Sequence, residues 1–423
     1  MNLGKLLATT AALSLLATAA MADIKIGASL PLTGNFSIAG SKHKQGYELC
    51  VKMLNAAGGI GGEKVDLIVS DNRSDPATAI NQYERFINVD NVDAVFGTFS
   101  SRLTFPVANV LAKNGFVHPV PAGGALRIYT QGHKNIFYFQ PNAAEYVGSS
   151  LQGLIRDLVP EGERPKTAAV VSADDFFANA VEAGFLGEKV MDPADGSVVK
   201  DLAPGYLKDI GIDVVFKEKW PEEGFNDWLN LANKIKRSNA DLIIALTASA
   251  EEAVQLTRAL KTVKAEAKMV YYSQGTQHEF YEGTQEASNS ILMHTSWHPA
   301  APYTGLLAGK EFTNADFVAA FEKEYGSAPD EDAAIPFAVC QGIEQAILGA
   351  GSTDNAKMGE WLSARTKDDP VRTILGRFYW DEVGLPVDKP FLVAQWNNGE
   401  LQFVYPTDEF PEVSKMTYPK GGF

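Results

Sequence analysis

Short apolar runs alternate with longer segments of helical periodicity along the chain from Ile24 onward. The runs are rich in β-branched residues, which is typical of buried strands, and the longer segments repeat apolar residues every three to four positions. In the first part of the chain, strands are predicted at residues 24–30, 65–70, 92–99 and 116–119. Helices are predicted between them at residues 41–57, 76–89 and 103–113. This alternation indicates a parallel sheet with crossover helices.

The same pattern begins again after Pro141. Strands are predicted at residues 167–172, 213–216, 241–246 and 269–273, and helices at residues 143–158, from 177, 226–238 and 250–263. The last third adds a strand at 291–296 and helices at 314–325 and 333–348. It ends in a hairpin whose first strand is 391–396 and whose turn is at 397–399. These late elements are too few for a core of their own. We therefore expect two α/β lobes, both completed by the last third of the chain.

The N-terminus has the three parts of a secretory signal peptide. Lys5 precedes an apolar stretch at residues 6–19, and Ala20, Met21 and Ala22 form a small-residue cleavage site, so cleavage is expected after Ala22. The apolar stretch is too short to span a membrane comfortably, and no later segment resembles a membrane span. The first cysteine is Cys50, so no lipid-carrying cysteine follows the signal. We expect a freely diffusing protein of the periplasm.

Charge and cysteine content limit the partners further. The net charge of −15 argues against nucleic acid or an anionic membrane as a partner, because both require clustered Lys and Arg. Cys50 and Cys340 are the two cysteines. In an oxidising compartment they form a disulfide if the fold brings them together, and otherwise they remain two separate buried thiols. Two cysteines alone cannot hold zinc.

Four motifs in the first lobe point to a known family. They are residues 26–34 (IGASLPLTG), 55–60 (NAAGGI), 71–76 (DNRSDP) and 97–101 (GTFSS). In order and spacing, this segment resembles the substrate-binding proteins of branched-chain amino-acid-type ABC transporters, the leucine-binding-protein-like receptors. Over the second lobe the resemblance is mainly one of topology.

The resemblance implies a type I periplasmic binding fold, in which two doubly wound parallel-sheet lobes are joined by a three-crossover hinge. The implied division is a signal peptide at 1–22, a first lobe at 23–141 and 298–388, and a second lobe at 142–297 and 389–423. The helix at 333–348 then lies in the first lobe, close enough to the first helix for a bridge between Cys50 and Cys340. The family also implies a monomer that needs no cofactor and delivers its ligand to an ABC permease in the inner membrane.

Ser100 and Ser101 give the strongest local signal for a ligand site, because they end a predicted strand and precede a helix. Ligands bind at such strand ends in open α/β sheets, and the free N–H groups of the helix attract a carboxylate. The alternative is that both serines are ordinary helix caps. The family pattern favours Ser101 as a ligand contact. Arg102 follows directly and either pairs with an anionic ligand or extends into solvent.

Two positions depart from the amino-acid receptors of the family. Ala122, Gly123 and Gly124 follow the next strand and form either a pocket wall or a tight turn, and the family commonly has a hydroxyl residue where Gly124 stands. The family also supplies an acid for the ligand's ammonium after the strand that here leads to Gln274, and the next acid in this chain is Glu279. Since a buried ammonium without a carboxylate is costly, either Glu279 supplies the charge or the ligand is not an α-amino acid.

Aromatic residues are the remaining candidates for the pocket wall. Phe36, Phe177 and Trp297 fall at predicted interlobe ends, although core packing explains any one of them taken alone. His298 follows at the hinge as a possible hydrogen-bond donor. It has no second ligand at metal-binding spacing, so no metal site is predicted.

We predict no catalytic residue, because no nucleophile is paired with a base by a recognised spacing. An exported hydrolase therefore fits poorly. The favoured function is a receptor that captures a small hydrophobic or branched-chain amino acid, or a related carboxylate, for import. The alternatives are a receptor for a non-amino-acid ligand, such as an aromatic acid or a short amide, and a ligand sensor for a signalling system.

Overall fold

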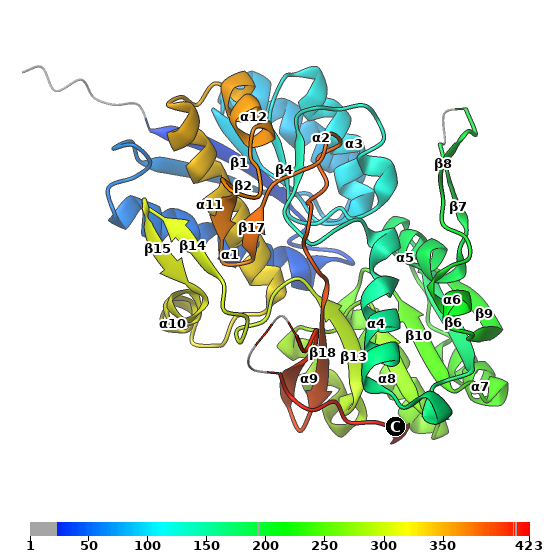
Figure 1. Ribbon diagram of the computed structural model, residues 1–423. Helices are drawn as coiled ribbons and strands as arrows, with labels where there is room; N and C mark the ends of the chain where they lie inside the picture. The colour runs from blue at the N-terminus through cyan, green and yellow to red at the C-terminus, as the bar shows by residue number, and fades with distance from the viewer. Residues whose placement is uncertain (1–22, 193–194, 409, 411–412) are drawn as a thin grey trace, which may run out of the picture.

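The computed structural model describes residues 23–192, 195–408, 410 and 413–423 and consists of two α/β lobes (Figure 1). The predicted signal peptide and its cleavage site lie almost wholly in residues 1–22, outside the described residues. The chain passes between the two lobes after β5 (Ile136–Tyr138), after β13 (Ile291–Thr295) and after β17 (Gly376–Phe378). The two lobes are therefore linked by three crossovers.

The first lobe contains a parallel sheet in the order β2-β1-β3, with a second parallel pair, β4-β5, beside it. Its main elements are β1 (Ile24–Leu30), α1 (Ser37–Ala56), β2 (Val65–Asp71), α2 (Pro76–Arg85), β3 (Ala94–Phe96), α3 (Ser101–Lys113), β4 (His118–Val120), α10 (Asn314–Tyr325), α11 (Glu331–Ala350) and α12 (Asn355–Ser363). Helix α11 returns from the last third of the chain to pack along α1. The close packing depends on Gly46, because a Cβ there would collide with the Ala333 carbonyl of α11.

The second lobe contains a seven-stranded sheet in the order β19-β18-β13-β12-β10-β6-β9. Its main elements are α4 (Gly148–Leu158), β6 (Thr167–Asp174), α5 (Phe176–Leu186), α6 (Tyr206–Asp209), β9 (Asp213–Pro221), α7 (Trp228–Ser238), β10 (Leu242–Leu246), α8 (Ala250–Val263), β12 (Met269–Tyr272), α9 (His278–Thr284), β18 (Leu392–Asn397) and β19 (Glu400–Tyr405). Strands β6, β9, β10, β12 and β13 are parallel, and β18 and β19 add an antiparallel edge.

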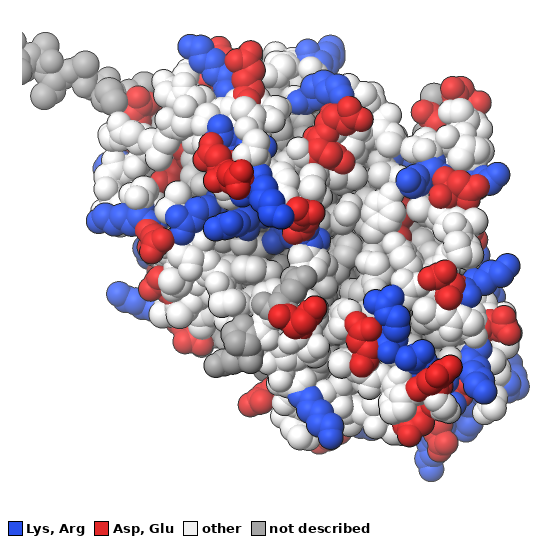
Figure 2. Space-filling view, viewed as in Figure 1, with Lys and Arg blue, Asp and Glu red and all other residues white. Residues whose placement is uncertain are grey.

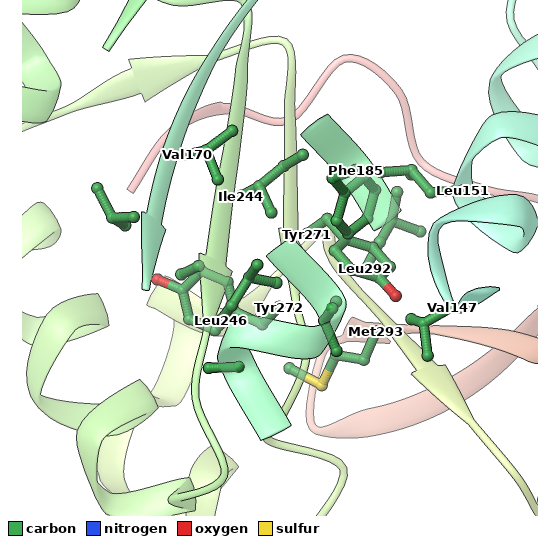
Figure 3. Close-up of a cluster of buried hydrophobic side chains, with 14 of the residues drawn as sticks. Val147, Leu151, Val170, Phe185, Ile244, Leu246, Tyr271, Tyr272, Leu292 and Met293 are labelled. Atoms are coloured by element: carbon green, nitrogen blue, oxygen red, sulfur yellow. The ribbon is translucent and has the colours of Figure 1, made fainter. Parts of the chain in front are cut away.

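Strands β6, β10, β12 and β13 of the second lobe are buried on both faces, as their continuous apolar runs predict, whereas the edge strand β9 is largely exposed. Figure 3 shows Val170, Ile244, Tyr271 and Leu292 meeting in the core of this lobe, each contributed by a different neighbouring strand. All four side chains are no more than 1% exposed. This core positions the carboxyl ends of the parallel strands side by side, next to the first lobe.

Smaller antiparallel pairs complete the chain, and the sequence did not predict them. They are β7-β8 (Lys189–Met191 and Val198–Asp201), β14-β15 (Thr304–Leu307 and Lys310–Thr313), β16-β17 (Val371–Thr373 and Gly376–Phe378) and β11-β20 (Glu266–Ala267 and Gly421–Gly422). The β7-β8 hairpin projects from the second lobe in Figure 1. These strands are short, so they leave little periodicity in the sequence.

Cys50 of α1 and Cys340 of α11 form a disulfide in the structure. The bond spans 290 residues of sequence, and both residues are buried, with exposures of 0% and 2%. It fastens the returning helix to the first lobe.

Helix α11 is also the one described helix that is long and apolar enough to cross a membrane by length and composition alone, which the sequence analysis did not anticipate. In the structure, 78% of its apolar window is buried, and Glu331 and Asp332 open its first turn. It is the central helix of the first lobe's core.

Candidate functional site

A cavity lies between the lobes at the carboxyl ends of the parallel strands. Its lining residues are Phe99, Ser100, Ser101, Ala122, Gly123, Gly124, Tyr138, Gln140, Phe177, Ala248, Gln274, His294, Glu331, Asp332 and Ile335. The space that the centre of a water molecule can reach in the cavity is about 40 Å³. Since a single water needs roughly 10–15 Å³ by that measure, the cavity is narrow and suited to a small ligand.

The N-terminus of α3 forms one wall. Ser100 is the residue before the helix, and within the described part of the chain its side chain makes no capping hydrogen bond. The Ser101 hydroxyl accepts a hydrogen bond from the Ala125 backbone N–H at 3.3 Å. Both serines are almost fully buried and line the cavity. The first turn of a helix carries a partial positive charge, so this wall is suited to a carboxylate.

The segment Ala122 to Gly124 lies beside the serines, and its backbone carbonyls accept hydrogen bonds that hold it in place. The Thr104 hydroxyl donates to the Ala122 carbonyl at 2.8 Å, and the Tyr129 hydroxyl donates to the Gly123 carbonyl at 2.8 Å. A Cβ at Gly123 would lie 2.7 Å from the methyl carbon of Thr104. The small residues thus let the backbone of this segment pack closely against α3, where it forms part of the cavity wall.

The second lobe supplies Phe177, Ala248, Gln274 and His294 to the opposite wall. His294 lies on β13, and its Nδ1 is 3.1 Å from the Tyr271 hydroxyl. Burial lowers the pKa of His294 to about 4, so its ring is neutral at physiological pH. The Gln274 side-chain oxygen accepts a hydrogen bond from Gln277 at 3.0 Å. This wall is mostly apolar and uncharged.

Glu331 and Asp332, in the first turn of α11, bring negative charge to the cavity. The Glu331 carboxylate accepts from the Thr276 hydroxyl at 2.7 Å and from the Ser296 backbone N–H at 2.9 Å. The Asp332 carboxylate accepts from the Gln277 side-chain N–H at 2.6 Å. Thr276 and Gln277 follow β12 of the second lobe, so both acids also link the lobes.

The acids outnumber the cations around this end of the cavity. Lys42 lies 3.0 Å from Glu279 and 3.6 Å from Asp330. Burial raises the pKa of Asp332 well above its usual range, and the charges of Asp330 and Glu331 raise it further. A cation in the cavity would lower the pKa of Asp332 again, because an opposite charge favours the ionised carboxylate.

Seven of the predicted site residues line this one cavity: Ser100, Ser101, Ala122, Gly123, Gly124, Phe177 and Gln274. Phe36 lies just behind it, with its ring 5.6 Å from the ring of Phe99, which is part of the wall. The strand-end rule thus brings most of the predicted residues together.

Trp297 and His298 lie outside the cavity. The Trp297 ring is buried in the first lobe's core and donates to the Asn314 side-chain oxygen at 2.9 Å. His298 Nε2 lies 2.8 Å from the Leu401 carbonyl, and its Nδ1 accepts from the Ala300 backbone N–H at 3.1 Å. The polar atoms of both rings are thus satisfied within the protein, and both residues border a separate groove.

Arg102 is also not part of the cavity wall. Its guanidinium Nη1 lies 3.0 Å from Glu222 and 3.1 Å from Glu223 of the second lobe. It therefore forms an ion pair across the lobe boundary.

Glu279 does not supply the acid that the sequence analysis sought, because it pairs with Lys42 and borders the outer groove. The cavity acids are Glu331 and Asp332, which the sequence analysis missed together with Phe99, Tyr138, Gln140, Ala248, His294 and Ile335. His294 lies near the carboxyl end of a predicted strand, so the strand-end rule offered a signal for it. Acids at the start of α11 are common helix-stabilising residues and offered none.

The described residues contain no cluster of three or more His, Cys, Asp or Glu side chains that would hold a metal ion. On the face shown in Figure 2, Lys and Arg side chains are interspersed with Asp and Glu. The cavity is therefore the feature that points most directly to a small-molecule ligand.

Comparison with known proteins agrees with the two-lobed fold. Leu/Ile/Val-binding protein homolog 7 of Brucella abortus is 25% identical over 416 residues, which cover 97% of this chain and 98% of that protein. The substrate binding protein LivJ of Streptococcus pneumoniae, solved in complex with isoleucine, superposes with a TM-score of 0.73 at 19% identity and covers 91% of this chain and 100% of its own. A solute binding protein of an R. palustris ABC transporter, solved in complex with benzoate, gives a TM-score of 0.71 at 18% identity over 90% of this chain and 95% of its own.

These likenesses confirm the predicted two-lobed fold and the resemblance carried by the four motifs of the first lobe. The relatives are binding proteins, which agrees with the prediction of a receptor rather than an enzyme. The model of the periplasmic binding protein family matches residues 23–400, and the chain belongs to that family.

Proposed function

We propose that this chain is the receptor of an ABC importer and that it captures a small hydrophobic α-amino acid between its lobes. The observation that carries the proposal is the pair of carboxylates, Glu331 and Asp332, in the wall of a cavity whose other end is the N-terminus of α3. A zwitterion matches this division of charge. Its carboxylate would lie against Ser100 and Ser101, and its ammonium against the two acids.

The apolar part of the wall supports a hydrophobic side chain. Phe99 and Ile335 from the first lobe face Phe177 and Ala248 from the second. Such a wall favours an apolar group by the hydrophobic effect, while the few polar groups fix its orientation. The small free volume favours a ligand of the size of valine, leucine or isoleucine over a long or branched peptide.

An aromatic acid is the second candidate, and a specific observation favours it. Burial and neighbouring acids raise the pKa of Asp332 well above its usual range, which favours the neutral carboxyl in the absence of a cation. A neutral Asp332 tolerates a ligand without an amine. The R. palustris solute binding protein solved in complex with benzoate supports this candidate.

The predicted compartment and partner belong to the same proposal. After cleavage behind Ala22, the receptor would diffuse as a monomer in the periplasm and deliver its ligand to a permease of the inner membrane. We place the first lobe at residues 23–141 and 298–388 and the second at 142–297 and 389–423. Loss of ligand uptake on deletion would separate transport from a sensor role, which binding alone would not.

Calorimetry with the mature protein from Asp23 tests the ligand class. The probes are leucine, isoleucine and valine, 4-methylpentanoate as leucine without its amine, and benzoate. We expect leucine to bind more tightly than 4-methylpentanoate. Asp332→Asn should weaken leucine binding at least tenfold and leave 4-methylpentanoate binding nearly unchanged, because it removes only the partner of the amine.

Asp316→Asn provides a matched control, because Asp316 caps α10 at the surface, away from the cavity. It should leave all affinities unchanged. Tight binding of benzoate or 4-methylpentanoate with no binding of the amino acids would reject the amino-acid proposal and favour the aromatic-acid alternative.

A further inference from the structure

The hydroxyl group that the amino-acid receptors of the family carry at the position of Gly124 has a counterpart here on a different strand. A Cβ built on Gly124 would lie 2.9 Å from the hydroxyl oxygen of Tyr138. Tyr138 is the last residue of β5, and both residues line the cavity. The Tyr138 hydroxyl thus occupies the space into which a side chain at 124 would begin to grow.

The position of this hydroxyl is fixed by the rest of the residue. The Tyr138 backbone N–H donates to the Gly384 carbonyl at 3.0 Å, and its carbonyl accepts from the Trp380 ring N–H at 2.7 Å. The Tyr138 ring packs against the Tyr129 ring with 5.5 Å between centroids. With both the backbone and the ring held, the hydroxyl has little freedom to turn away from the cavity.

Within the described ranges the hydroxyl makes no hydrogen bond to another residue, and its oxygen is not among the buried polar atoms that lack a partner. It therefore opens onto the cavity, although Tyr138 as a whole is only 3% exposed. The neighbouring Tyr129 hydroxyl, by contrast, donates to the Gly123 carbonyl. A ligand in the cavity would remove this hydroxyl from water, and desolvation of a hydroxyl without a new partner is costly. An unpaired hydroxyl that borders a ligand cavity indicates that its partner is the ligand.

We propose that Tyr138 is a ligand-binding and specificity-determining residue whose hydroxyl donates a hydrogen bond to the carboxylate of the ligand. Gly124 is required because any side chain there would displace this hydroxyl. The inference rests on the proposed function to the extent that the ligand carries a carboxylate. It goes further by assigning the donor that the sequence at position 124 lacks.

The protonation state agrees with a donor role. Burial raises the pKa of Tyr138, and the nearby carboxylates of Glu331 and Glu145 raise it further, so the phenol stays protonated. A phenol can donate to a carboxylate, which accepts only, and a hydrogen bond to a charged partner is among the stronger ones.

The test measures the affinities of leucine, isoleucine, 4-methylpentanoate and benzoate for Tyr138→Phe by calorimetry, together with the melting temperature of the ligand-free protein. The variant should weaken the most tightly bound probe roughly 10- to 100-fold. Its ligand-free melting temperature should be maintained, because no hydrogen bond within the protein is lost.

Tyr83→Phe is the matched control, because it removes the same atom from a buried hydroxyl that donates to the Phe96 carbonyl at 2.7 Å. Tyr83 is not part of the cavity wall. This control should lower the melting temperature and leave the affinity unchanged, the reverse of the result for Tyr138→Phe.

Gly124→Ala tests the geometry separately. It should weaken binding in the wild-type background. In the Tyr138→Phe background the same substitution should cost less, because the hydroxyl oxygen at 2.9 Å is gone and only the contacts with Ala144 at 3.2 and 3.3 Å remain. Additive effects would show that the hydroxyl does not occupy this space and would overturn the inference.

The outcomes distinguish the inference from the proposed function. Unchanged affinity of Tyr138→Phe for a probe that the wild type binds would overturn the role of Tyr138 and leave the function standing. Binding of benzoate alone, weakened by Tyr138→Phe, would overturn the amino-acid proposal and support Tyr138. Failure of the wild type to bind any probe would overturn both, because both rest on a carboxylate ligand.

Discussion

Removing Arg102 should weaken ligand binding modestly by loosening the closed arrangement of the lobes. Arg102 on the first lobe pairs with Glu222 and Glu223 on the second, and the three side chains are 31%, 22% and 66% exposed. Ion pairs this exposed contribute about 1 kcal/mol or less after solvent screening. If that energy exists only when the lobes are closed, Arg102→Ala should raise the dissociation constant up to about fivefold.

Calorimetry at low salt and at 0.5 M NaCl measures this effect, since screening should remove most of the difference between variant and wild type at high salt. Arg156→Ala is the matched control, because Arg156 pairs with Asp157 within the second lobe at 3.2 Å. It should not alter affinity. If Arg102→Ala lowers the affinity for the ligand more than a hundredfold and the loss persists at high salt, Arg102 contacts the ligand directly. An unchanged affinity at low salt would refute a role of the Arg102 ion pairs in stabilising the closed lobes.

Three further changes have defined outcomes. Burial raises the pKa of Glu145 to about 7, from an ordinary value of 4.5, so its ionisation destabilises the fold as the pH rises from about 5 to 8. The free energy of unfolding of Glu145→Gln, measured with urea, should therefore rise by about 2 kcal/mol relative to that of the wild type between pH 5.5 and pH 8. A difference between the two proteins that does not change with pH would contradict this. Replacing Cys50 and Cys340 by Ser should lower the free energy of unfolding by about 4 kcal/mol and the melting temperature by about 5 °C. The disulfide of the native wild type should be reduced slowly, because both cysteines are buried. Gly184→Ala would place a methyl group against the Glu145 carbonyl and should cost roughly 1–3 kcal/mol, while Gly162→Ala, which meets open space, should be neutral.

The helices and strands were predictable where their signals are local. The predicted bounds of α8 and α10 agree with the structure to the residue. Ser249 caps α8 by accepting from the Glu252 N–H, and Thr313 and Asp316 form a reciprocal capping box on α10. Such caps involve residues three positions apart, so they are visible in sequence.

Strand ends were less predictable, because pairing is not local. The apolar run predicted as a strand at 92–99 pairs with β1 only over Ala94–Phe96. Its continuation, from Gly97 to Ser100, turns along the edge of the lobe to reach the cavity. The hydrophobic pattern shows that a segment is buried, and the tertiary structure decides where hydrogen bonding to the next strand stops.

Trp297 lies in the first lobe's core and outside the cavity for a related reason. An aromatic residue at a hinge is equally compatible with a pocket wall and with the core of either lobe. Its ring N–H requires an acceptor when buried, and Asn314, which starts a helix in the first lobe, supplies it. The partner lies 17 residues away in the sequence, so the side-chain direction depended on a contact that no local pattern reveals.

The charge of the cavity shows most clearly why site chemistry must be judged in space. The sequence analysis sought an acid directly after β12 and found Gln274, which left the ligand's amine without a partner. In the structure, Thr276 and Gln277 of the same segment donate to Glu331 and Asp332 at 2.7 and 2.6 Å. The acids thus adjoin the place where one was expected, although they lie on α11 of the opposite lobe, about 55 residues later. Because the wall is shared by two lobes, either can provide a charge, and the lack of an acid at one sequence position does not exclude an amino-acid ligand.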